Sequence, residues 1–140
     1  FSQSQNKEDQ VGNYMQEHME KIIESTSIHQ AAKIMKEKKI GSLLVCCGEE
    51  ITGIVTEEIF TRKVLGDNLN PDTTLVSELM DKPTTINSTQ SMDSALNCMH
   101  QNDVRYLVVT EDNKTKGIIS LKDLTIYFKH KFVTAQDIDE

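Results

Sequence analysis

Apolar residues recur with a helical period in two short stretches of the chain. In the first stretch the positions i, i+3, i+4 and i+7 are held by Ile28, Ala31, Ala32 and Met35. In the second they are held by Met92, Ala95, Leu96 and Met99. A serine precedes each stretch, Ser27 in one and Ser91 in the other, as is typical of a helix N-cap. The pattern therefore predicts two helices, each with one apolar face.

A pair of short apolar runs follows each predicted helix, with a polar turn between the two runs. The four runs are residues 43–45, 51–56, 106–109 and 117–119. The turns, residues 48–50 and 111–115, contain Gly, Asp and Asn, so each pair of runs predicts a β-hairpin. A further helix is expected over residues 57–65, and another is expected to begin near Leu121.

These two sets of elements are copies of one unit. A displacement of 64 residues, the distance from Ser27 to Ser91, holds the register without a gap as far as Thr56, which falls on Ser120. The polar stretch 66–74 joins the copies. We expect a flexible lead-in over 1–10, a first repeat over 11–70, a second over 71–130 and a C-terminal tail over 131–140. One unit alone is too small to bury its sheet well, so we expect the two to pack together.

Composition narrows the function classes. The chain has 140 residues, 37% of them hydrophobic and 26% charged, with a formal net charge of −7. A nucleic-acid binder needs a clustered basic surface, so we expect no nucleic-acid partner. No run of 18 apolar residues occurs, so we expect no membrane partner and a cytoplasmic location. Cys46 and Cys47 are adjacent, and alternation along a strand predicts one buried thiol and one exposed thiol.

Familiar catalytic and metal-binding patterns are missing from the sequence. It contains neither Gly-x-x-x-x-Gly-Lys-Ser/Thr nor Gly-x-Gly-x-x-Gly. Its four histidines are scattered, without metal-ligand spacing, and no nucleophile stands beside a base. The six methionines are interpreted as core packing. We therefore expect no catalytic residues, no metal site and no enzymatic activity.

Several passages of the repeat resemble one family, the tandem cystathionine-β-synthase (CBS) domain pair, or Bateman module. They are residues 76–83, which contain a Met-x-x-Pro entry, residues 39–45 and 103–109, and residues 53–56 and 117–123. The last pair resembles the family's Gly-x-x-Ser/Thr-x-x-Asp signature. The resemblance extends over nearly all of residues 11–129. It implies an α/β fold of two βαββα repeats packed about a pseudo-twofold axis, with two related clefts between them.

The resemblance also implies a ligand site. In the family the Ser/Thr-x-x-Asp element holds the ribose of an adenosine ligand. Here Asp123 takes the ribose role and Ser120 the phosphate-facing role, with Ile119 beside them. A carboxylate can accept hydrogen bonds from both ribose hydroxyls, and a helix N-terminus favours an anion. The alternative is a plain helix start, with a capping serine and an acidic residue in the first turn.

The first repeat departs from this pattern. Thr56 corresponds to Ser120, but Ile59 stands where the carboxylate is expected and Glu58 comes one position early. A second set of site residues is implied on the strands. Ile40, Gly41 and Ser42 form either an adenine-flanking wall or only a strand entry, and Arg105 and Tyr106 are the corresponding pair in the second repeat. Arg105 either meets phosphate or is a solvated surface residue.

The sequence thus predicts a non-catalytic regulatory module that binds an adenosine-type nucleotide (AMP, ADP, ATP or S-adenosylmethionine, with AMP preferred) and needs no obligatory cofactor. The alternatives are a dimerisation module without a ligand and an enzyme whose residues lie far apart in sequence. A regulated enzyme or transporter is an expected partner. A homodimer is predicted because the later helix of each repeat carries apolar residues in excess: Ile59, Val64, Leu65, Leu124, Tyr127 and Phe128.

Overall fold

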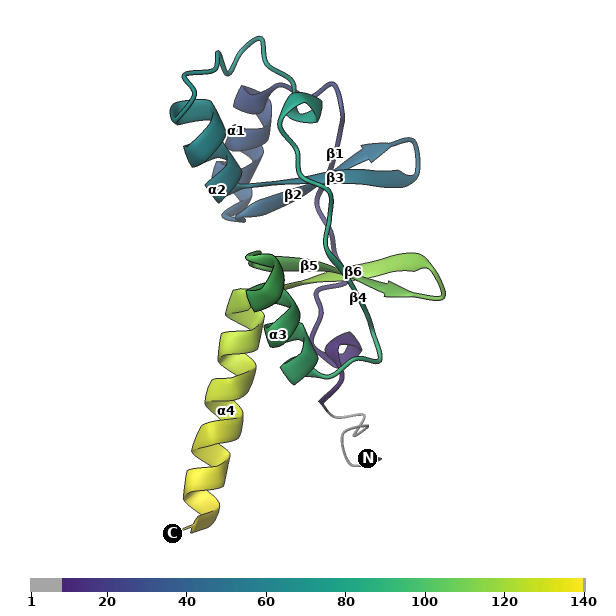
Figure 1. Cartoon of the computed structure of the whole chain (residues 1–140), viewed down its shortest axis with the longest axis vertical. Coiled ribbons are helices and arrows are strands. Elements are labelled where there is room, and N and C mark those ends of the chain that lie inside the picture. The colour runs from purple at the N-terminus through teal and green to yellow at the C-terminus, as the bar shows by residue number, and fades with distance from the viewer. Residues whose placement is uncertain (1–8, 140) are drawn as a thin grey trace. The chain divides into compact units, whose positions relative to one another are not determined.

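The computed structural model describes residues 9–139, with side chains through residue 133, and divides them into two compact units (Figure 1). One unit is Met19–Pro83. The other combines the chain before Met19 with the chain from Thr84 onward. The segment that precedes each repeat therefore folds with the other repeat. Of the predicted lead-in 1–10, only Asp9 and Gln10 lie within the described residues.

The Met19–Pro83 unit is a three-stranded sheet with helices. Its elements are β1 (Lys21–Ile23), α1 (Ile28–Lys38), β2 (Ser42–Cys47), β3 (Glu50–Thr56), α2 (Glu57–Ile59), the π-helical turn η4 (Phe60–Leu65) and the 3-10 turn η5 (Val76–Glu78). The strand order is β1-β2-β3, with β1 parallel to β2 and β2 antiparallel to β3. Figure 1 shows α1 and α2 on the same face of this sheet.

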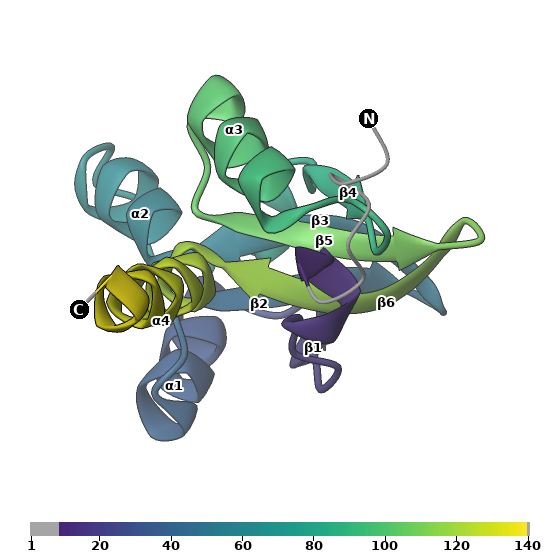
Figure 2. The same cartoon turned by 90° about the horizontal axis from the view of Figure 1, so that it is seen from below.

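The second unit repeats this plan. Its elements are the 3-10 turn η3 (Val11–Asn13), β4 (Thr85–Asn87), α3 (Met92–Asn102), β5 (Tyr106–Glu111), β6 (Lys114–Ser120) and α4 (Leu121–Asp139). The order is β4-β5-β6, again parallel and then antiparallel. Figures 1 and 2 show α3 and α4 on one face of the sheet. The predicted mixed α/β class is confirmed, and the predicted tail 131–140 continues α4 as far as Asp139.

Both predicted N-caps are present. Ser27 Oγ accepts from Gln30 N at 3.1 Å, and Ser91 Oγ accepts from Ser94 N at 3.0 Å. The residues buried on the two helices are Ile28, Ala31 and Met35, and Met92, Ala95 and Met99. The i+4 positions that were also predicted to face the core, Ala32 and Leu96, are exposed. The sheet covers a narrower stripe of each helix than the sequence pattern suggested.

Four of the six apolar residues that were assigned to an assembly surface are buried in a core. Ile59 and Val64 are buried in the core of the Met19–Pro83 unit, and Leu124 and Tyr127 are buried in the core of the second unit. Of the remaining two, Phe128 is partly buried against the second core, and only Leu65 is largely exposed, at 77%. The four buried residues therefore do not support a homodimer. Other apolar side chains of α4 are exposed, Ile126 at 47%, Phe132 at 63% and Val133 at 46%, and the homodimer stays a prediction.

Two polar contacts of Asp9, with Tyr127 and with Lys131 at 3.9 Å, fasten the start of the described chain to α4. The Tyr127 hydroxyl donates to the Asp9 carboxylate, and the Tyr14 ring meets the Tyr127 ring edge-on at 4.8 Å. Burial, and secondly the bond to Asp9, raise the pKa of Tyr127 far above its ordinary value. The hydroxyl therefore keeps its proton and remains a donor at physiological pH. The segment before Met19 is held at this end by Asp9.

Candidate functional site

The centre of the site is the junction where β6 ends at Ser120 and α4 begins at Leu121. Asp123 Oδ2 accepts from Ser120 N at 2.9 Å, and Ser120 Oγ accepts from Asp123 N at 3.1 Å. The two residues thus form a reciprocal capping box, with a serine N-cap and an acidic third position. The helix start that the sequence analysis gave as the alternative role of Ser120 and Asp123 is therefore present. It holds one oxygen of the Asp123 carboxylate at the helix N-terminus.

The other oxygen of Asp123 meets a residue that the sequence analysis did not single out. Gln16 Nε2 donates to Asp123 Oδ1 at 3.3 Å. Gln16 comes from the N-terminal segment, which lies along the edge of β6. Two backbone hydrogen bonds pair it with Ile118: Gln16 N donates to Ile118 O at 2.8 Å, and Ile118 N donates to Gln16 O at 3.0 Å.

The motif glycine explains how this segment approaches so closely. A Cβ on Gly117 would lie 2.6 Å from Gln16 O and 2.8 Å from Met15 Sδ. In the other unit a Cβ on Gly53 would lie 2.7 Å from Met80 Cγ. A side chain at either position would displace the segment that packs on it. The glycine of the Gly-x-x-Ser/Thr motif is therefore needed here for close approach, since neither glycine has a positive φ.

The predicted strand residues of the second repeat lie beside this junction. Tyr106 is the cross-strand partner of Ser120, and Leu121 N donates to Arg105 O at 2.8 Å. Arg105 is exposed, Tyr106 is half-buried, and Asp123 is half-buried. The structure therefore brings Arg105, Tyr106, Ser120 and Asp123 together. Ile119 is fully buried in the core of the unit, so its side chain does not line an exposed site.

The first repeat places its predicted residues in the same way. Ser42 pairs with Thr56 across β2 and β3, and Glu57 N donates to Gly41 O at 3.1 Å. Ile40 packs partly buried against the core. Thr56 Oγ1 accepts from Ile59 N at 3.2 Å, which makes Thr56 a simple N-cap.

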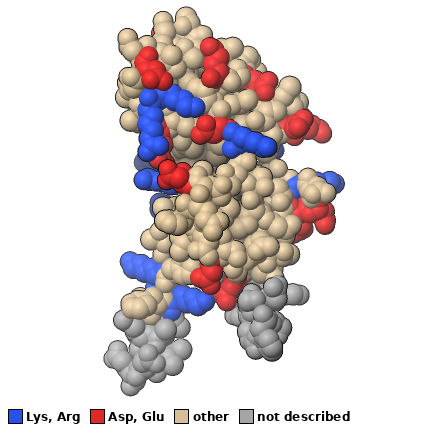
Figure 3. Space-filling model, viewed as in Figure 1, with Lys and Arg blue, Asp and Glu red and all other residues tan. Residues whose placement is uncertain are grey.

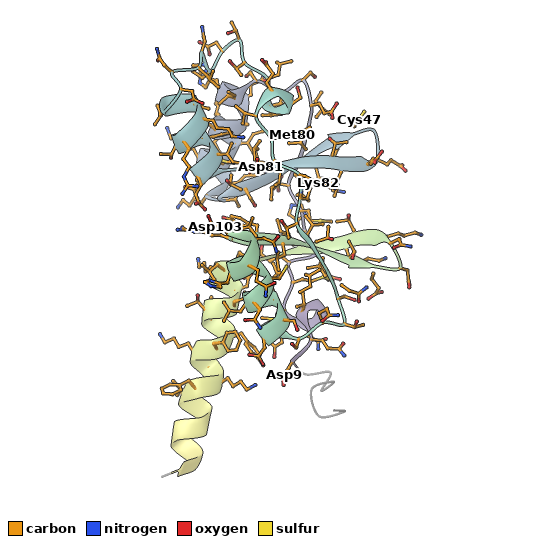
Figure 4. All side chains as sticks on the ribbon, viewed as in Figure 1. Asp9, Cys47, Met80, Asp81, Lys82 and Asp103 are labelled. Atoms are coloured by element: carbon orange, nitrogen blue, oxygen red, sulfur yellow. The ribbon has the colours of Figure 1, made fainter. Side chains whose placement is uncertain are left out.

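No carboxylate replaces the missing one in this repeat. Ile59 is only 7% exposed and belongs to the core cluster. Glu58 reaches Arg62 one turn along the helix, with 3.5 Å between Oε2 and Nη2. The place of Gln16 is taken by Asp81, which bridges Ile54 and lies 3.5 Å from Lys63 Nζ (Figure 4). The chain therefore holds one Ser-x-x-Asp junction and one apolar counterpart of it.

A signal for Gln16 is present in the sequence. The stretches that begin at Val11 and Val76 match with a displacement one residue longer than the main repeat, and each ends in a methionine, Met15 or Met80. The residue that follows that methionine is Gln16 in one case and Asp81 in the other. Aligning the two repeats shows that they differ at this position. The alignment does not show that the side chain reaches Asp123, because that contact joins residues far apart in the chain.

The cysteines and histidines show no built site. Cys46 is buried and Cys47 is exposed near the β2–β3 turn, as predicted (Figure 4). His29 and His100 are exposed, and His29 Nδ1 lies 2.8 Å from Asp72 Oδ1. Among the side chains that the structure describes, those of residues 9–133, no group of three or more His, Cys, Asp or Glu is arranged to hold a metal ion.

Two further observations bear on partners. On the face drawn in Figure 3, Lys and Arg side chains are interspersed with Asp and Glu side chains and do not gather into one basic surface. None of the helices in the described part of the chain has the length and apolar run needed to cross a bilayer.

Comparison with known proteins identifies the family. The CBS domain model matches twice, at residues 11–66 and 76–130. The chain therefore belongs to the CBS-domain family, and the resemblance noted in its sequence is confirmed. Among curated relatives, the uncharacterized Bacillus subtilis protein YlbB is 26% identical over 102 residues, which are 71% of this chain and 69% of YlbB. Other relatives are longer: the chain spans 55% of Methanocaldococcus jannaschii MJ0450 and 19% of Arabidopsis thaliana CBSCBSPB3.

Solved structures share the fold. A CBS-domain protein from Burkholderia ambifaria has a TM-score of 0.75 and 34% identity, covering 78% of this chain and 81% of its own. A protein from Pyrococcus horikoshii has a TM-score of 0.81 and 25% identity, covering 87% and 93%. PAE2072 from Pyrobaculum aerophilum, solved in complex with AMP, shares the fold with a TM-score of 0.74 and 18% identity, covering 81% of this chain and 88% of PAE2072. A cyanobacterial CBS-CP12 protein described as hexameric has a TM-score of 0.75 and 30% identity, covering 83% of this chain and 66% of that protein.

Proposed function

We propose that this chain is a non-catalytic regulatory module that binds one adenosine nucleotide, AMP in preference, through the Ser120–Asp123 junction. The observation that carries the proposal is the fixed carboxylate of Asp123. One of its oxygens is held by Ser120 N at 2.9 Å, at the start of a helix. A carboxylate offers about four acceptor positions, so the capping bond leaves positions for a ribose diol.

The groups around Asp123 suit the rest of such a ligand. Ser120 lies at the N-terminus of α4, where the positive end of the helix dipole favours a phosphate. Arg105 is exposed beside it and can supply a charge-assisted bond to the same phosphate. The base-binding role of Ile40, Gly41 and Ser42 stays an expectation from the family resemblance. A protein of the same fold, PAE2072, is complexed with AMP.

The first repeat supports a single site. Ile59 cannot accept a hydrogen bond, and Glu58 is paired with Arg62. A ribose beside Thr56 would leave its hydroxyls without an acceptor, and each unsatisfied buried hydroxyl costs about 1–3 kcal/mol. The expected occupancy is therefore one nucleotide per chain.

The rival function is a dimerisation module without a ligand, and one observation favours it. The capping box gives Ser120 and Asp123 a complete structural role with no ligand bound. The homodimer and a regulated enzyme or transporter stay predictions under either function. We place the protein in the cytoplasm, since its three cysteines are all free thiols, which are typical of a reducing compartment.

A thermal-shift experiment separates the two functions. A ligand that binds only the folded state, at a hundred times its Kd, adds about 2.7 kcal/mol of stability. For a chain of this length that raises Tm by roughly 5–11 °C. The chain is melted with AMP, ADP, ATP, S-adenosylmethionine and NAD at millimolar concentration. A rise with AMP is expected, whereas five unchanged melting curves would reject the nucleotide and support the dimerisation module.

A further inference from the structure

The two oxygens of Asp123 have different partners, and only one of them is local. Oδ2 is held by the backbone of Ser120, three residues away. Oδ1 is held at 3.3 Å by the amide of Gln16, which comes from the opposite end of the chain. Rotation of the carboxylate about its Cβ–Cγ bond would lengthen the bond from Ser120 N, so this contact already restrains the group. The Gln16 contact adds a second hydrogen bond that opposes the same rotation.

The backbone that presents Gln16 is itself firmly placed. Besides the paired bonds with Ile118, Val11 N donates to Gln90 O at 2.8 Å and Gly12 N donates to Ser88 O at 2.9 Å. Met15 packs against the core of the same unit. Gln16 is exposed, but it extends from a segment whose backbone is hydrogen-bonded to Ser88, Gln90 and Ile118. Such a side chain can hold Asp123 without being part of the core.

We propose that Gln16 is a positioning residue that gives the Asp123 site its preference for ribose over deoxyribose. The inference rests on the proposed function. Ser120 N and Gln16 Nε2 donate hydrogen bonds to different oxygens of the Asp123 carboxylate. Each of the two oxygens therefore keeps an acceptor position for a ligand. A 2′,3′-diol uses both oxygens at once and needs the carboxylate plane fixed. A 2′-deoxy sugar uses one oxygen and does not.

The other repeat provides an internal comparison. At the position of Gln16 it has Asp81, an acceptor, which pairs with Lys63 at 3.5 Å, and at the position of Asp123 it has Ile59. The amide donor occurs in the unit that has the carboxylate and is absent from the unit that lacks it. The two positions therefore differ together between the units, as expected if Gln16 positions Asp123.

The test measures AMP and 2′-deoxy-AMP binding by calorimetry to the wild type, Gln16→Ala and, as a control on the same segment, Glu17→Ala. The wild type should prefer AMP. Gln16→Ala should weaken AMP binding about three- to tenfold, the effect of one hydrogen bond, and leave 2′-deoxy-AMP binding nearly unchanged. Glu17→Ala should keep the wild-type ratio of the two Kd values. In an Asp123→Asn background, Gln16→Ala should no longer change that ratio.

The possible results distinguish the role of Gln16 from the proposed nucleotide binding. A wild type that prefers AMP, together with a Gln16→Ala variant that keeps the preference, overturns the role of Gln16 and leaves the nucleotide site standing. Equal weakening toward both nucleotides would show a merely structural role and also overturns it. A wild type that binds neither nucleotide removes the proposed function and this inference together. A melting curve of Gln16→Ala verifies that the variant is folded.

Discussion

Replacing Asp123 with asparagine should weaken AMP binding at least tenfold while leaving the free energy of unfolding nearly unchanged. Asparagine keeps an oxygen that can accept from Ser120 N, so the start of α4 retains its capping bond. It loses the negative charge and one of the two acceptor atoms. A hydrogen bond to a charged group contributes about 1.5–3 kcal/mol, and about 1.4 kcal/mol is tenfold in affinity. Calorimetric titration measures the affinity, and urea denaturation the stability.

The matched control is Glu58→Gln in the first repeat. It makes the same change of acid to amide in the corresponding helix, and it weakens the ion pair between Glu58 and Arg62, whose side chains are 38% and 73% exposed. Exposed pairs of this kind contribute little. Its Kd for AMP should equal that of the wild type. If Asp123→Asn binds AMP as well as the wild type, the ribose is not on Asp123, whatever the ligand.

Replacing Leu124 with alanine should lower the free energy of unfolding by about 2–5 kcal/mol, the range for a buried leucine truncated in a core. Leu124 is fully buried and packs among the residues of the second core, which include Leu107 and Ile119. The matched control is Leu121→Ala, the same substitution on the same helix at a residue that is 36% exposed. It should change stability by about 0.5 kcal/mol. Urea denaturation of the three proteins gives the comparison.

This pair of variants also decides how α4 is used. If Leu124 is a core residue, Leu124→Ala should lower the free energy of unfolding by the same amount at low and high protein concentration. If Leu124→Ala were no more destabilising than Leu121→Ala, or if its effect grew with protein concentration, Leu124 would lie at an interface between copies. The structure would then be wrong about the inward face of α4.

The repeat made much of the fold predictable. Because one periodic pattern occurs twice in register, each helix or hairpin assigned in one copy supported the same assignment in the other. The serine caps and the adjacent thiols of Cys46 and Cys47 follow from local chemistry, and the structure has them. The hairpin turns lie within the predicted stretches 48–50 and 111–115 but are shorter, with two residues each. In the second hairpin the turn residues Asp112 and Asn113 both have positive φ, as a type I′ turn requires.

Other features depend on tertiary contacts that no local pattern carries. β1 and β4 have three residues each, too few to show an alternation, and only the family resemblance implied them. The π-helical turn Phe60–Leu65 has no signal in its composition. Leu124 and Tyr127 were assigned to an assembly surface but are buried, because a sequence shows that a residue is apolar but not which neighbour covers it. The contact between Gln16 and Asp123 was missed for the same reason.

The site could be predicted in part. Ser120 and Asp123 form the expected junction, and Tyr106 and Arg105 lie beside it. The replacement of an acid by Ile59 was visible in the sequence, and the structure adds that Ile59 is buried. The sequence could not show that Asp123 is already bonded through both oxygens, which is what gives Gln16 a role.

The most direct test of the central claim is the stoichiometry of AMP binding to the wild-type chain, measured by isothermal titration calorimetry. The single Ser120–Asp123 junction predicts one AMP per 140-residue chain, with no second site of comparable affinity. Two equal sites per chain would contradict the asymmetry between Asp123 and Ile59, and a titration without heat or saturation would contradict nucleotide binding itself.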